Sequence, residues 1–92
     1  MKKPEDELAY AQALDSSGYH EKAETEYKRI VRVHHSLEGA YRYGMFLKKQ
    51  QRPAEAKAQF QTVIKEISLH PRYVRRQNQK WLWLSRKEVA VL

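Results

Sequence analysis

The amino-acid sequence predicts an all-α fold of about five helices, and three observations support that prediction. The 92 residues are rich in good helix formers and include only three glycines and three prolines. Apolar residues recur at the three-and-four spacing of one-faced helices along most of the chain. The apolar pattern also repeats after 33 residues, which is typical of stacked helical hairpins. At this length we expect a single domain over residues 1–92.

The first two predicted helices span about residues 5–16 and 20–34. Their apolar stripes consist of Tyr10, Ala11 and Leu14 in the first helix and of Ala23, Tyr27, Ile30 and Val31 in the second. Gly18 lies between the two helices, and glycine readily adopts the positive φ that a tight turn requires. We therefore expect these helices to pair as a hairpin.

The next two predicted helices span about residues 37–50 and 53–68. Ser36 suits an N-cap, and Pro53 suits a first helical turn, where its missing N–H costs no hydrogen bond. The two apolar stripes consist of Leu37, Ala40, Tyr43, Gly44 and Leu47 and of Ala56, Phe60, Val63, Ile64 and Ile67. These helices are expected to form a second hairpin.

A fifth, long helix is predicted over about residues 71–89. Pro71 suits its first turn, as Pro53 suits that of the fourth helix. Its packing stripe is expected to consist of Val74, Gln77, Trp81 and Leu84. We expect this face to pack against the second hairpin.

A shift of 33 residues superimposes the two hairpins. It places Tyr10 on Tyr43, Ala11 on Gly44, Leu14 on Leu47, Ala23 on Ala56, Tyr27 on Phe60, Ile30 on Val63 and Val31 on Ile64. With Gly18 at the first turn, and Gln51 in place of glycine at the second, these residues resemble the tetratricopeptide repeat. The resemblance implies a right-handed superhelical stack of two hairpins, at about residues 5–35 and 36–69, followed by a capping helix at about 71–90. An ordinary helical bundle is the alternative interpretation.

The resemblance also implies a concave groove lined by the first helix of each hairpin and by the capping helix. In the first hairpin the groove-facing residues would be Glu5, Leu8, Gln12 and Asp15, and the second would add Glu38. The predicted partner-binding residues are Tyr41, Arg42, Met45, Lys48, Lys49, Arg72, Arg75, Arg76, Gln79 and Trp83, with Lys80 at the edge. Because guanidinium groups bind carboxylates well, we expect a protein-interaction scaffold that binds an acidic or carboxylate-bearing segment of another protein.

The charge distribution keeps other functions open. The formal net charge is +7, and residues 71–92 carry six basic side chains against one acidic, whereas residues 1–70 carry 12 against 10. Binding of nucleic acid or of an anionic membrane through residues 71–92 is one alternative, and a solvated face is another. Because such arrays usually need three repeats, self-association as a homodimer also stays open, with Trp83 in the core, in a dimer contact or in a ligand contact.

No catalytic, cofactor or metal site is predicted. The sequence contains no cysteine, which excludes disulfides and thiolate ligands, and its four histidines lack a ligand spacing. It contains neither a GxSxG motif nor a glycine-rich phosphate loop, so we expect a protein that is not an enzyme. No stretch approaches the roughly 20 apolar residues of a membrane span. We expect a cytoplasmic location, and the chain also resembles the cytoplasmic, C-terminal part of small bacterial membrane-anchored proteins.

Overall fold

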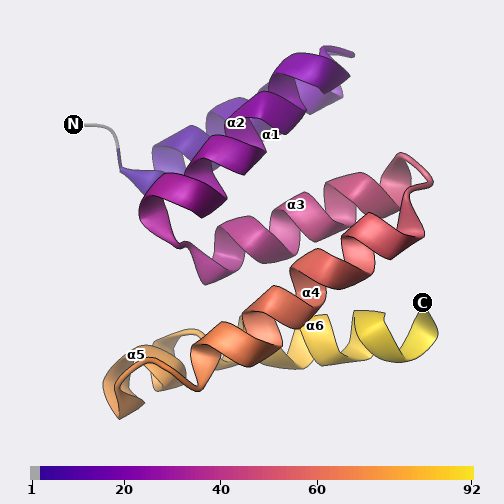
Figure 1. The fold of residues 1–92 in the computed structure, drawn as a ribbon. Helices are drawn as coiled ribbons and strands as arrows, with labels where there is room; N and C mark the ends of the chain where they lie inside the picture. The colour runs from indigo at the N-terminus through magenta and orange to yellow at the C-terminus, as the bar shows by residue number, and fades with distance from the viewer. Residues whose placement is uncertain (1–2) are drawn as a thin grey trace.

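In the computed structural model, residues 3–92 are described and form six helices with no strand among them (Figure 1). The helices are α1 (Pro4–Ser16), α2 (His20–His34), α3 (Leu37–Lys49), α4 (Pro53–Ile67), α5 (Arg72–Gln77) and α6 (Gln79–Val91). Helix α1 packs on α2, α3 on α4, and α2 on α3, so that two hairpins stack side by side. The Cα radius of gyration of the described chain is 12.6 Å, which is that of a compact domain of this length. The all-α prediction is confirmed.

The two hairpins have the same helix lengths. A shift of 33 residues carries Pro4–Ser16 onto Leu37–Lys49 and His20–His34 onto Pro53–Ile67. The turns inside the hairpins also match, because Gly18 has a φ of 89° and Gln51, which follows it by the same shift, has a φ of 60°. Gln51 thus adopts the left-handed conformation that glycine adopts more cheaply. The absent glycine changes the energy of the second turn but not its shape.

Small residues allow the helices of each hairpin to approach closely. Ala23 and Ala56 are fully buried, and so is Phe60. A Cβ atom added to Gly44 would lie 2.6 Å from Phe60 Cε1, well inside van der Waals contact. Gly44 is therefore required by the packing of α3 against α4, and not by its backbone conformation.

The position of each hairpin in the stack decides how much of it is buried. Tyr43 is 5 % exposed, whereas its counterpart Tyr10 is 51 % exposed. Tyr43 stacks on Tyr27 of the preceding hairpin, with ring centroids 6.0 Å apart. Tyr10 belongs to the first hairpin of the stack, where no earlier hairpin covers α1 within the described residues.

Charged side chains also join the hairpins. The two terminal guanidinium nitrogens of Arg52, Nη1 and Nη2, donate to the carboxylate of Glu24 at 2.9 Å, and the Tyr43 hydroxyl donates to the same carboxylate at 2.9 Å. The hydrogen bonds from Arg52, opposed by burial, lower the pKa of Glu24 to about 2. Glu24 of α2 is therefore ionised at neutral pH and connects its helix to the second hairpin.

The predicted helix over residues 71–89 is divided in two by Asn78. The Asn78 side-chain amide donates to the Val74 carbonyl at 2.9 Å, and its backbone has a φ of −108° and a ψ of 10°. Asparagine often leaves a helix in this way because its side chain competes for backbone hydrogen bonds. The expected packing stripe is accordingly wrong at Gln77, which is exposed.

Helix α6 packs through Trp81, as expected, and through Leu82 and Ser85, which were not part of the expected stripe. Trp81 and Leu82 contact the core of α3 and α4, and Ser85 is fully buried one turn later. Helix α6 lies against α4 and, less extensively, against α3, antiparallel to α4 (Figure 1). It thereby takes the place that the first helix of a third hairpin would have. No second helix follows it within residues 3–92.

Candidate functional site

The structure does not gather the ten predicted partner-binding residues in one groove. One hollow beside α1 is lined by Arg42, Met45, Lys48 and Lys49, whereas Tyr41 packs against Phe60 and Trp81. A second hollow is lined by Arg72, Arg75, Arg76 and Gln79. Trp83 borders a third hollow together with Gln79. There are two physical reasons. The chain leaves α4 at the end remote from the C-terminus of α3, so α5 lies far from the last turn of α3 (Figure 1). The break at Asn78 then prevents α5 and α6 from continuing as one helix with one face. These hollows have different chemistry.

The hollow between α1 and α3, here called the α1–α3 hollow, has a volume of about 670 Å³. Its lining comprises Gln12, Asp15, Ser16, Tyr27, Arg42, Met45, Phe46, Lys48 and Lys49. Leu8 was expected to face it, but Leu8 is 4 % exposed and belongs to the core. The expectation is wrong because the apolar face of α1 includes Leu8 in addition to the predicted stripe, so Leu8 points into the core.

The cations of the α1–α3 hollow are neutralised within the chain. Lys49 Nζ lies 2.8 Å from Asp15 Oδ2, Lys48 Nζ lies 2.7 Å from Glu88 Oε2, and Arg42 Nε lies 2.8 Å from Glu38 Oε2. Burial alone would raise the pKa of Asp15, but hydrogen bonds from Lys49 and His20 outweigh it and lower that pKa. Asp15 therefore stays ionised at neutral pH, and little positive charge is left for a ligand.

Tyr41 and Arg42 fasten α6 to α3. The Tyr41 ring lies between Phe60 and Trp81, at centroid distances of 5.7 Å and 5.5 Å. Arg42 Cζ lies 5.4 Å and Lys80 Nζ 5.1 Å from the centre of the Trp81 ring, within cation–π distance. These contacts give Tyr41 and Arg42 a packing role between α3 and α6.

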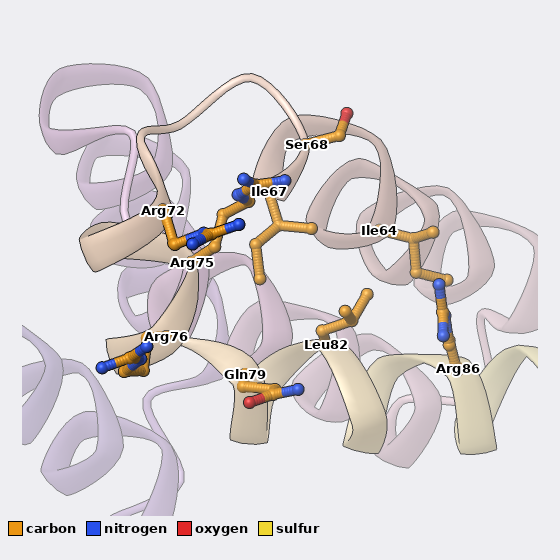
Figure 2. Close-up of a pocket in the computed structure, with 9 residues that line it drawn as sticks. All are labelled: Ile64, Ile67, Ser68, Arg72, Arg75, Arg76, Gln79, Leu82 and Arg86. Carbon is orange, nitrogen blue, oxygen red and sulfur yellow. The ribbon is translucent and has the colours of Figure 1, made fainter.

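The hollow among α4, α5 and α6 is different, and we call it the arginine groove (Figure 2). It is lined by Ile64, Ile67, Ser68, Arg72, Arg75, Arg76, Gln79, Leu82 and Arg86 and has a volume of about 450 Å³. Figure 2 shows Ile67 and Leu82 between the arginines of α5 on one side and Arg86 on the other. The groove therefore has an apolar floor and cationic walls.

The arginines of this groove lack ion-pair partners. Arg72, Arg75, Arg76 and Arg86 are exposed, and within the described residues no carboxylate lies within 4 Å of their guanidinium nitrogens. Helix α5 contains no acidic residue, and Glu88 of α6 is occupied by Lys48. Glu66 of α4 forms no ion pair with these arginines either. The positive charge of residues 71–92 is thus concentrated and unneutralised here.

Trp83 lies next to this groove. Its side chain is 64 % exposed, so it is not a core residue of the single chain. Gln79 lines both the arginine groove and the smaller hollow bordered by Trp83, and Trp83 and Arg86 are three residues apart on α6. An indole and a guanidinium group are accordingly neighbours at the edge of the groove.

Half of the arginine groove was missed from the sequence. Ile64 and Ile67 were assigned to the packing stripe of their helix, and Ser68, Leu82 and Arg86 were not singled out. One signal was present, because Ile64 repeats Val31, which is half-buried against both core clusters. An apolar residue at the position of Ile64 is therefore expected to be buried by the helix that follows in the stack.

Comparisons of the chain with known protein families, with curated proteins and with solved structures find no match. Among residues 3–92, no set of three or more histidine, aspartate or glutamate side chains is arranged to hold a metal ion. Nor is any described helix both long and apolar enough to cross a membrane.

Proposed function

We propose that this protein is an interaction module of the tetratricopeptide-repeat type that binds an acidic segment of another protein in the arginine groove. One observation carries the proposal. Four arginines line a groove with an apolar floor and have no acidic partner among the described residues, whereas the cations of the α1–α3 hollow are each paired. The two helical hairpins, which coincide after a shift of 33 residues, support assignment to this repeat class.

The lining of the groove favours a protein ligand over the other anionic partners. A guanidinium group binds a carboxylate through two parallel hydrogen bonds, and four such groups suit a segment with several carboxylates. The half-buried Ile64 and Leu82 offer apolar area that a phosphate backbone cannot use. A peptide with acidic and apolar side chains matches both parts of the lining.

The test is a selection from a displayed library of random peptides on the immobilised protein. We expect the bound pool to be enriched in aspartate and glutamate and to lose binding to R72E/R75E/R76E. The matched control is K22E/K57E/K87E, which changes the charge equally at exposed lysines outside the groove and should retain the pool. A pool without acidic enrichment, or one that binds both variants equally, would reject the proposal.

The alternatives give different results in direct binding experiments. A labelled oligonucleotide or vesicles with anionic lipid would bind in place of peptide if residues 71–92 served those partners, with an affinity that falls steeply as salt rises. Sedimentation of the protein alone measures self-association. A cytoplasmic location and an upstream membrane anchor belong to this proposal as predictions, and membrane fractionation of the native protein would check them.

A further inference from the structure

We infer that the segment bound in the arginine groove is an acidic amphipathic helix, which lies antiparallel to α6 and completes a third hairpin of the stack. The inference rests on the proposed function and adds the shape and direction of the ligand. It follows from where the groove lies in the architecture, from the spacing of its lining and from its charge.

The groove occupies the place of a missing helix. Helix α2 packs on α1, and α4 packs on α3, as the returning helix of each hairpin. Helix α6 lies on the second hairpin as the first helix of a third one would. A returning helix would lie on α6 beside α4, and those two helices supply the floor of the groove.

The lining is spaced for a helix. Gln79, Leu82 and Arg86 follow one face of α6 at three-and-four spacing, and Ile64 and Ile67 do the same on α4. From Gln79 to Arg86 the groove runs for about 10 Å, which is about two helical turns. A stripe of apolar residues on a ligand helix can enter between these two edges, as in other helix-in-groove complexes.

The charge fixes the composition and the direction of the ligand. A helix antiparallel to α6 would bring its C-terminal end to α5, where Arg72, Arg75 and Arg76 lie. The negative pole of a helix is at its C-terminus, so this direction is electrostatically favoured. Acidic residues should accumulate at that end and at the position opposite Arg86. A second copy of the chain is disfavoured, because each copy has a formal net charge of +7.

The first experiment compares two displayed peptide libraries of equal length and with the same acidic and apolar residues at the randomised positions. One is built on a helix-forming scaffold, and the other carries proline at every third position, which prevents a helix. We expect tight binders from the helical library alone, with apolar positions at three-and-four spacing and at least tenfold loss on R72E/R75E/R76E. Equally tight acidic binders from the proline library would overturn the helical ligand while leaving the proposed function intact. Absence of acidic binders from both libraries would reject the proposed function itself.

The second experiment tests the direction by disulfide trapping. The chain has no cysteine, so S68C near α5 and A90C beyond Arg86 each create a single thiol. A selected peptide with a C-terminal cysteine should cross-link to S68C, and the same peptide with an N-terminal cysteine should cross-link to A90C. The reverse pairing, or equal cross-linking at both sites, would overturn the antiparallel direction.

Discussion

The α1–α3 hollow and the arginine groove are both lined by cations, yet they differ in what those cations do. In the α1–α3 hollow, Lys48 and Lys49 hold carboxylates on α6 and α1 and so join helices. In the arginine groove, four guanidinium groups form no ion pair within residues 3–92, and they lie beside the half-buried Ile64 and Leu82 and the buried Ile67. A count of basic residues does not distinguish the two surfaces, but their ion-pair partners do.

The difference separates stability from recognition. A cation that is paired inside the chain contributes to the fold, although only by a few tenths of a kcal/mol to about 1 kcal/mol when exposed. Unpaired arginines close together repel one another, so a fold retains them at a small cost in stability. Loss of positive charge in the arginine groove should therefore lower the affinity for an acidic ligand and slightly raise the stability. Loss of positive charge in the α1–α3 hollow should lower the stability and leave the affinity nearly unchanged.

The largest expected effect is on binding. For an acidic peptide selected on the protein, R72E/R75E/R76E should lower the affinity about 100-fold, since each charged contact contributes on the order of 1 kcal/mol after screening. The variant R42E/K48E/K49E, which reverses the same number of charges in the α1–α3 hollow, should change the affinity less than threefold. Titration followed by fluorescence anisotropy measures both. An equal loss in the two variants would remove the distinction between the surfaces.

The second prediction concerns the packing on which both surfaces depend. Gly44→Ala should destabilise the protein by about 2 kcal/mol, because the added methyl group collides with the fully buried Phe60 ring. Urea unfolding followed by circular dichroism measures the change. In G44A/F60L the smaller side chain should make room, so the double variant should be more stable than the sum of the two single changes. If the two changes were strictly additive, the contact with Phe60 would not be the cause of the destabilisation by Gly44→Ala.

The third prediction concerns the ion pair between Glu24 and Arg52, which joins the two hairpins and is paired within the chain like the cations of the α1–α3 hollow. The pKa of Glu24 is lowered from its ordinary 4.5 to about 2, so its contribution is complete above pH 4.5 and is lost as the pH falls toward 2. Glu24→Gln should cost about 1 kcal/mol at pH 7, after allowance for solvent screening, and almost nothing at pH 2. Thermal unfolding of both proteins at several pH values measures this. A difference that is independent of pH would show that the ionised carboxylate of Glu24 does not stabilise the fold through Arg52.

Much of the fold could be predicted from the sequence, because helical periodicity and the 33-residue repeat are local patterns. The first four helices lie within one residue of their predicted ends. The division of the last helix was missed, since it depends on one competing hydrogen bond from Asn78. The arginines of α5 were identified as candidates, but their separation from Lys48 and Lys49 depends on the direction in which the chain leaves α4. The carboxylates that pair with Lys48 and Lys49 lie on helices distant in the sequence, so residue spacing within one helix does not predict these ion pairs.

The smallest expected effect is the most direct comparison of the two surfaces. Arg72→Gln removes repulsion with Arg75 and Arg76, which lie three and four residues along the same helix, and should raise stability by about 0.3 kcal/mol. Lys48→Gln removes the ion pair with Glu88 and should lower stability by a similar amount. Parallel urea titrations of many replicates resolve differences of this size. Because both changes remove one positive charge, general charge repulsion predicts the same sign for both, whereas pairing predicts opposite signs.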